Sequence, residues 1–403
     1  MNTFGQILRR HREGRDLSLR QLGSLTKFGF TFLSQVERGE RRATEKLARL
    51  CDDALEADGA LIEAYREGQA GENNMHRRTV LRAMGSLAAS PLPLVQWEAL
   101  RHSMAAALDP DSDRWIQVVA DYGIAYYQMP ADQVMDYLRA DLTVLQALIS
   151  VATGPERDLL LRAACRLSVI VALNMVTAGQ TLAARRWWRD AHRYADASRD
   201  PDSIVLTRAW DVVNGCYDGR SPSEVVAAAD DVLPLVDERA SSASCGLLAG
   251  RAQALSLAGR HTEAITTVQR LAQKAERLSA DVVDDVDSLW GWPEHRLRHT
   301  EAWVYAHAGN LTEATRAQEQ AVGLYPAPLT RLRTQVQLHH AAALIRGGYI
   351  PDGILQATEL LDGLPSEQHN EVLRAVALQV VDAVPVKERR GPIYLELTDR
   401  LAT

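Results

Sequence analysis

Apolar residues near the N-terminus recur every three or four positions in five short segments. This spacing places them on one side of a helix, and polar residues fill the remaining positions. The pattern predicts helices over residues 4–13, 18–26, 30–38, 44–55 and 60–65. The polar stretch from Gln69 to Asn74 then interrupts the pattern, which indicates a domain boundary.

The second and third predicted helices are joined by a tight turn. Ser18 is a favourable N-cap, and Gln21 stands three residues later, as in a capping box. We expect the turn to end at Gly29, with this glycine in a backbone geometry closed to other residues. Leu33 and Val36 are predicted to face the core, so the other side chains of the third helix are predicted to face outward.

Two short helices with a polar, outward-facing second helix are typical of a DNA-reading unit. The caps, the turn and the ending LSQVERGERR resemble the Cro/repressor-type (XRE) family of helix-turn-helix regulators over about the first 66 residues. Position by position, the resemblance implies base-reading roles for Phe30, Thr31 and Gln35 and phosphate contacts for Arg38, Arg41 and Arg42. Lys27 and Ser34 complete the predicted DNA-binding set.

Phe30 departs from the polar residue that is usual at its position in that family. Two roles are open for it: contact with a thymine methyl group, or packing inside the domain. The whole segment also has an alternative interpretation, because a helical hairpin inside a larger bundle would have the same apolar spacing. The distribution of charge favours the DNA-reading interpretation.

Charge is divided unevenly along the chain. The formal net charge is −7, yet residues 1–50 hold 11 basic and 5 acidic residues, a net of +6, which leaves −13 for the remainder. A basic head on an acidic body is typical of a DNA-binding domain joined to a module with another task, because phosphate neutralisation supplies most non-specific affinity. In the first predicted helix, Arg9, Arg10 and Arg12 are expected to approach phosphates.

The predicted domains are residues 1–68, a linker with a short helix over 69–96, and a body over 97–403. The linker segment from His76 to Leu94 resembles a twin-arginine export signal, but a whole domain precedes it, and its apolar run is too short to span a bilayer. The four cysteines are far apart and lack disulfide or zinc spacing. We therefore expect a cytoplasmic protein with no membrane contact and with its cysteines in the core.

The body is predicted to be all-α, because apolar residues keep helical spacing and no sustained alternating run occurs. Glycine turns separate pairs of helices at Gly179, Gly219, Gly259, Gly309 and Gly347, with spacings of 40, 40, 50 and 38 residues. The segments 247–278 and 295–326 repeat a pattern of small residues, a glycine turn and the letters TEA. They resemble tetratricopeptide repeats, which implies an α-solenoid whose first helices line a concave groove.

Two sets of residues are candidates for binding an effector in that groove. Asn174 and Asn214 each stand five residues before a turn glycine, so they could hold the backbone of an extended peptide. Trp210, Trp290 and Trp292 are candidates for an aromatic lining, with the sequence Trp-Gly-Trp-Pro as a pocket lip. The alternatives are that the asparagines brace neighbouring helices and that the tryptophans pack between repeats.

Motifs for metal, cofactor or catalytic chemistry are missing from the sequence. His295 and His299 stand four apart on a predicted helix, but the glutamate of the HExxH motif is absent. The sequence has no phosphate-binding glycine-rich loop with lysine and no nucleophile elbow. We expect neither an enzyme nor a cofactor.

The predicted fold is all-α: an N-terminal five-helix helix-turn-helix domain followed by a tetratricopeptide-like solenoid. This combination resembles the RRNPP group of regulators from Gram-positive bacteria. The resemblance implies a sequence-specific transcription regulator that binds a double-stranded DNA operator as a homodimer and responds to a signalling peptide. The Arg- and Ala-rich composition is compatible with a high-GC actinobacterial source, where a small-molecule effector is equally plausible. The alternative function is a protein-interaction scaffold that its head places on DNA.

Overall fold

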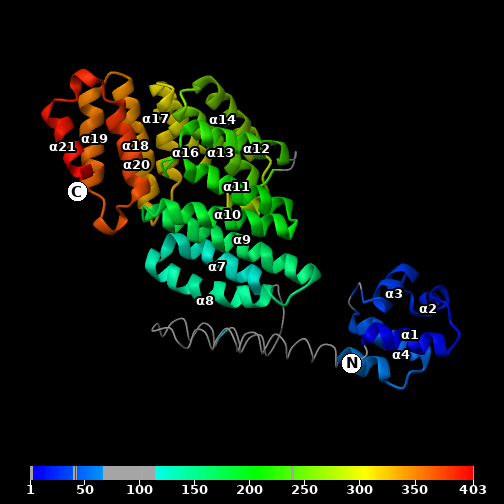
Figure 1. Ribbon diagram of the computed structural model, residues 1–403. Helices are drawn as coiled ribbons and strands as arrows, with labels where there is room; N and C mark the ends of the chain where they lie inside the picture. The colour runs from blue at the N-terminus through cyan, green and yellow to red at the C-terminus, as the bar shows by residue number, and fades with distance from the viewer. Residues whose placement is uncertain are drawn as a thin grey trace. The chain divides into compact units, whose positions relative to one another are not determined.

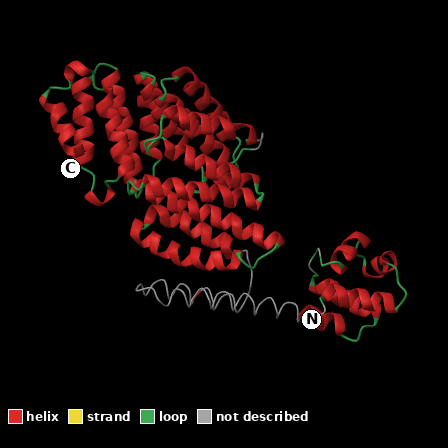
Figure 2. Ribbon diagram, viewed as in Figure 1, coloured by secondary structure: helices red, strands yellow, loops and turns green. Residues whose placement is uncertain are grey.

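A computed structural model describes two compact units, residues 1–111 and residues 112–403, and each is described here by itself. The described residues are 3–39, 41, 43–66, 101, 114–236 and 240–402. Helices and loops account for all of them, with no strand among these described residues (Figure 2). The predicted linker over 69–96 lies outside the described residues, so the predicted domain boundaries stay predictions.

The first unit contains the five predicted helices. They are α1 (Phe4–Gly14), α2 (Leu19–Thr26), α3 (Phe30–Glu37), α4 (Glu45–Leu55) and a helical segment over residues 60–66. The hydroxyls of Thr3, Ser18 and Thr44 cap α1, α2 and α4 by accepting backbone N–H bonds, and the predicted capping box of Ser18 and Gln21 is present. Leu8, Leu22, Leu33 and Leu47 meet in a small core.

The turn between α2 and α3 forms where it was predicted, but its glycine was given the wrong role. Lys27, rather than Gly29, takes the left-handed geometry with φ of 63°, whereas Gly29 has φ of −65° and is the N-cap of α3. The close approach occurs at Gly23, where an added Cβ would lie 2.7 Å from the carbonyl oxygen of Phe28. The tight turn therefore depends on a glycine inside α2 that lets the turn backbone pack against the helix.

The second unit is a solenoid of paired helices that stack in chain order from α7 to α21 (Figure 1). Its helices are α7 (Arg114–Gln128), α8 (Ala131–Ile149), α9 (Gly154–Thr177), α10 (Thr181–Ser198), α11 (Pro201–Gly215), α12 (Pro222–Val232), α13 (Ser242–Leu257), α14 (His261–Ala275), α15 (Ala280–Val283), α16 (Glu294–His307), α17 (Leu311–Leu324), α18 (Thr330–Arg346), α19 (Ile350–Asp362), α20 (Glu371–Ala383) and α21 (Pro392–Ala402). Three short 3-10 turns, Leu233–Leu235, Ser366–Gln368 and Val386–Glu388, join some of them.

The glycine periodicity predicted the turns of the solenoid correctly. Gly179, Gly219, Gly259 and Gly309 all have φ between 71° and 79°, and in the last turn Gly348 has φ of 95°. This left-handed geometry ends the first helix of a pair and lets the second fold back along it. The body is the predicted tetratricopeptide-like α-solenoid.

More than half of the residues of α9, α11, α13, α16 and α18 are buried, because neighbouring helices cover these first helices on several sides. Helix α9 differs from the others, since its length and composition alone would suit a membrane span. Its burial indicates a core helix instead, because 78% of its most apolar 18-residue stretch is covered by the rest of the solenoid. Helix α9 packs against α7, α8, α10 and α11, as a core helix of the solenoid does. Cys165 and Cys245 are buried in first helices, and Cys51 is buried in the first unit, as predicted.

Candidate DNA-reading helix and candidate ligand pocket

Helix α3 and the residues that flank it present most of the predicted DNA-binding side chains to solvent. Lys27, Thr31, Arg38 and Arg41 are exposed, and half of the Phe30 surface is exposed. Ser34 and Gln35 are half-buried, whereas Arg42 lies outside the described residues. Because Leu33 and Val36 fill the core, the start of α3 is free to enter a groove of DNA.

Aromatic and guanidinium groups pack on each other beside this surface. The Arg41 guanidinium lies 4.7 Å from the centre of the Phe32 ring, which stacks on Phe28 at 5.3 Å. The Arg20 guanidinium lies 5.4 Å from the centre of the Phe30 ring. Phe30 is thus held at the surface by a cation–π contact and does not pack inside the domain.

The predicted phosphate role of Arg12 is wrong. Its Nε donates to Glu37 Oε1 at 2.6 Å, its Nη2 donates to Glu37 Oε2 at 2.8 Å, and its Nη1 donates to the carbonyl oxygen of Leu17 at 2.9 Å. Its side chain is 11% exposed, so the guanidinium joins helices and does not reach outward. The bonds to Glu37 raise the pKa of Arg12. Arg9 is exposed, with Glu13 as its partner.

The second unit contains a pocket of about 160 Å³. Helices α9, α11, α13, α16, α18 and α20, which are first helices of their pairs, contribute its lining, as the repeat pattern predicted. Helix α7 and the segment before α16 add to it. The ring-bearing lining residues are Tyr126, Tyr127, Trp210, Tyr217, Trp290, Trp292, His299 and Tyr325.

The segment between α15 and α16 crosses to α7 beside the pocket. The Leu289 N–H donates to the carbonyl oxygen of Gly123 at 2.9 Å, and the Trp290 indole N–H donates to that of Val119 at 2.8 Å. A Cβ added at Gly123 would lie 2.4 Å from the Trp290 ring, so only glycine admits this approach. The predicted pocket lip is therefore anchored to a helix about 170 residues earlier in the chain.

Arg296 is the most closely held charged group in the pocket. Its guanidinium lies between two indoles, 5.6 Å from the Trp210 ring and 5.8 Å from the Trp292 ring. Its Nη2 donates to the Tyr127 hydroxyl at 3.1 Å and to the carbonyl oxygens of Ser288 and Leu289 at 3.2 and 3.1 Å. The same side chain thus braces the crossing segment and faces the pocket.

The two candidate asparagines are occupied by their own helices. The side-chain amide of Asn174 donates to the carbonyl oxygen of Ile170 at 2.8 Å, and that of Asn214 donates to Trp210 at 2.9 Å. Asn214 lines the pocket, whereas Asn174 is not among the lining residues. The structure thus brings Asn214, Trp210, Trp290 and Trp292 together and leaves Asn174 apart.

Histidines on the pocket side of α16 are buried and neutral. Burial lowers the pKa of His295 to about 3 and that of His299 to about 4, with the nearby Arg296 adding to both shifts. His299 shares a 2.7 Å hydrogen bond with the Tyr325 hydroxyl. Among the described residues, no group of three or more His, Cys, Asp or Glu side chains could hold a metal ion.

Comparisons with known proteins bear on the first unit. A family model described as a helix-turn-helix domain matches residues 3–65. Residues 3–65 are a helix-turn-helix domain. The chain also aligns with the crystal structure of Bacillus thuringiensis PlcR in complex with the peptide PapR7 and DNA, at 12% identity and a TM-score of 0.25 over 90% of this chain and 95% of that one. No curated protein matches the sequence.

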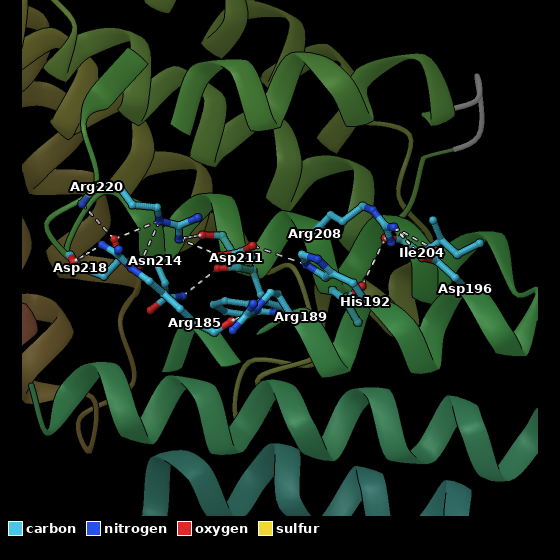
Figure 3. A network of polar contacts seen from close by, with 12 residues as sticks. Arg185, Arg189, His192, Asp196, Ile204, Arg208, Asp211, Asn214, Asp218 and Arg220 are labelled. Atoms are coloured by element: carbon cyan, nitrogen blue, oxygen red, sulfur yellow. Dashed lines mark hydrogen bonds and ion pairs between the residues drawn. The ribbon is translucent and has the colours of Figure 1, made fainter. Parts of the chain in front are cut away.

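Away from the helix-turn-helix domain, a polar network ties α11 to α10 and to the turn that follows α11 (Figure 3). Arg220 donates to Asp211 at 2.7 Å and to Asp218 at 3.0 Å, and Arg185 donates to the Asp218 carbonyl oxygen at 3.3 Å. The Asp218 side chain is fully buried. Because Trp210 lies on α11, this network fixes one wall of the pocket.

Sequence reasoning missed several residues at both sites. In the helix-turn-helix domain it missed Arg20, and in the pocket it missed Arg296 and Arg331. The signal for Arg296 was its position at the start of the helix that follows Trp-Gly-Trp-Pro, three residues after the proline. No local pattern marks Arg331 as a pocket residue, because α18 reaches the pocket only through the stacking of repeats.

Proposed function

We propose that this protein is a transcription regulator that binds a DNA operator through α3 and an effector through the solenoid pocket. The observation that carries the DNA-binding part is that α3 buries Leu33 and Val36 while Thr31 on the helix, Arg38 at its C-cap and Arg41 in the following loop stay exposed. A second helix held this way enters the major groove with its N-terminal end. Gln35, the third predicted base-reading residue, lies on the same helix as Phe30 and Thr31 and is half-buried.

A homodimer is part of the proposal. One recognition helix contacts a few base pairs, so two copies on half-sites one helical turn apart multiply the discrimination. The effector part rests on the pocket: its aromatic lining and its position between repeats and the crossing segment suit a ligand. A ligand there would contact Trp290, whose indole is bonded to α7, and could thereby shift the arrangement of the first solenoid helix.

The test compares two substitutions in the helix-turn-helix domain of the full-length protein. Gln35→Ala is expected to cost about 1–3 kcal/mol of binding and to relax preference at one base pair, because Gln pairs with a base edge. Arg41→Ala is expected to weaken all duplexes alike and to reduce the salt dependence, because Arg41 contacts phosphate. Affinity is measured on the protein's own upstream region and on random duplex at two salt concentrations.

Arg49→Ala is the matched control, since Arg49 is exposed on α4 and pairs with Glu45. It is expected to leave both affinities nearly unchanged. Equal losses on operator and random duplex from Gln35→Ala would refute its base-reading role. Operator affinity that never responds to any bound ligand would refute the effector part.

A further inference from the structure

The charge of the pocket is opposite to that of the body that contains it. Residues 112–403 hold 29 basic and 37 acidic residues, a net charge of −8, yet the pocket lining includes two arginines, Arg296 and Arg331, and no aspartate or glutamate. Among the described residues, neither arginine forms an ion pair. A positive pocket without its own counterion in an acidic domain indicates that the counterion comes with the ligand.

Both guanidiniums act on the same part of the pocket. Burial raises the pKa of the Tyr126 phenol to about 12, and Arg331 and Arg296 each oppose that rise. Tyr126, Arg296 and Arg331 also line the same pocket, so both arginines can act on an anion bound there. Within the described part of the chain, the hydrogen-bond partners of Arg296 all lie on Nη2, which leaves Nε and Nη1 as donors. These two nitrogens lie on different edges of the guanidinium, so each can donate to one oxygen of a bound anion.

Two buried polar atoms in the lining lack partners. Trp292, 6% exposed, has an indole N–H without an acceptor, and Gln253, 5% exposed, has a side-chain oxygen without a donor. A buried polar group without a partner costs about 1–3 kcal/mol. One unpaired donor and one unpaired acceptor suit a small molecule with few polar atoms. An extended peptide would need partners for an N–H and a C=O at every residue.

Most of the remaining lining is aromatic or aliphatic. Trp210, Trp290 and Trp292 present indole surfaces, and Leu173, Leu206 and Val213 fill the spaces between helices. The pocket volume of about 160 Å³ is close to that of an engineered protein cavity of about 150 Å³ that binds benzene. A planar ring stacks favourably on such surfaces.

We propose that the pocket binds a small aromatic carboxylate. Its ring lies among the tryptophans and its carboxylate pairs with Arg296 and Arg331. This inference rests on the proposed function, because it names the chemical class of the effector that the solenoid senses.

Isothermal titration calorimetry of the full-length protein tests the ligand class directly. The probes are benzoate, indole-3-acetate and 2-naphthoate, and the primary amide of each serves as a neutral control of the same shape. At least one acid is expected to bind, and to bind tenfold or more tightly than its amide. Equal affinity for acid and amide, or no binding of any acid at millimolar concentration, would overturn the proposal.

Arginine variants test the assignment of the site. Arg331→Gln is expected to weaken binding of the acid at least tenfold and to leave the amide unaffected, and Arg296→Gln is expected to do the same if circular dichroism shows it folded. Arg316→Gln is the control, because Arg316 is exposed on α17 and outside the pocket lining. An acid that binds Arg331→Gln as tightly as the unchanged protein would refute the site.

A parallel arm keeps this inference separate from the proposed function. Operator affinity is measured with and without each probe. If a neutral amide changes operator affinity and the acids do not, the result supports the proposed regulator function and refutes the assignment of a carboxylate ligand. If an acid binds the pocket without changing operator affinity, the result supports the proposed ligand class and refutes the role of that ligand as an effector of DNA binding.

Discussion

The side chain of Arg12 joins three helices of the helix-turn-helix domain. It lies on α1, holds the carboxylate that ends α3 and bonds the backbone just before α2. The Glu37 side chain is 6% exposed, so removal of Arg12 leaves a buried charge without its partner. Arg12→Ala is expected to destabilise the domain by about 3–5 kcal/mol, measured by chemical denaturation of the full-length protein.

Arg10→Ala is the control for this change, because Arg10 is exposed on the same helix. It is expected to remain as stable as the unchanged protein. Loss of DNA binding in Arg12→Ala should therefore accompany loss of the folded domain. A stably folded Arg12→Ala with weakened DNA binding would instead support a phosphate contact for Arg12.

At the residue scale, local signals were predictable and distant partners were not. The caps at Ser18 and Thr44 depend on atoms three residues away, so the sequence displays both members of each contact. The partner of Arg12 stands 25 residues later, and nothing near Arg12 identifies it. An arginine on the polar side of a helix gives the same sequence pattern whether its side chain binds a DNA phosphate or a glutamate of the same domain.

The crossing segment between α15 and α16 is the element that closes the pocket against α7. Gly123→Ala places a methyl group 2.4 Å from the Trp290 ring, which must then move. Overpacking of this kind typically costs about 1–3 kcal/mol. We expect a lower thermal midpoint, a change in tryptophan fluorescence and weaker binding of pocket ligands, with DNA binding by the helix-turn-helix domain unaffected.

Ile116→Ala on the same helix serves for comparison, since 61% of the Ile116 surface is exposed. Its expected effects on stability and fluorescence are small. Unchanged fluorescence and ligand affinity in Gly123→Ala would mean that the indole of Trp290 does not lie against α7 in solution.

At the element scale, the repeat pattern predicted the features that recur in every pair of helices, such as the turn between them. A turn glycine with positive φ recurs because each pair of helices needs the same reversal, so Gly179 and Gly259 could be assigned from spacing alone. The crossing segment could not be assigned in this way. Its contacts with Val119 and Gly123 join positions that only the curvature of the whole solenoid brings together.

At the scale of the whole molecule, the uneven charge along the chain predicted a DNA-binding head joined to a module with another task, and this division of tasks stays a prediction. The acidic body nevertheless encloses a pocket with two arginines, which its net charge could not reveal. The solenoid core also holds several histidines in neutral form, because burial lowers their pKa. These residues are His295, His299, His307 and His339.

These histidines predict how stability depends on pH. In the unfolded chain they take up protons as pH falls below their ordinary pKa of 6.5, whereas in the folded solenoid His295 and His307 stay neutral down to about pH 3 and His299 down to about pH 4. The unfolded state therefore binds more protons throughout this window. Stability is fully present above pH 6.5 and is lost as pH falls, by up to about 1.4 kcal/mol per pH unit for each histidine.

Urea denaturation of the solenoid between about pH 7 and about pH 5 measures this slope, in a range where most carboxylates stay ionised. His295→Phe should reduce the slope, because phenylalanine keeps a ring in place of the imidazole that lies 4.4 Å from the Tyr325 ring and has no proton to gain. Below pH 6.5 this variant should therefore lose less stability than the unchanged protein. A free energy of unfolding that stays constant from pH 7 to pH 5 would show that these histidines are accessible to protons in the folded solenoid.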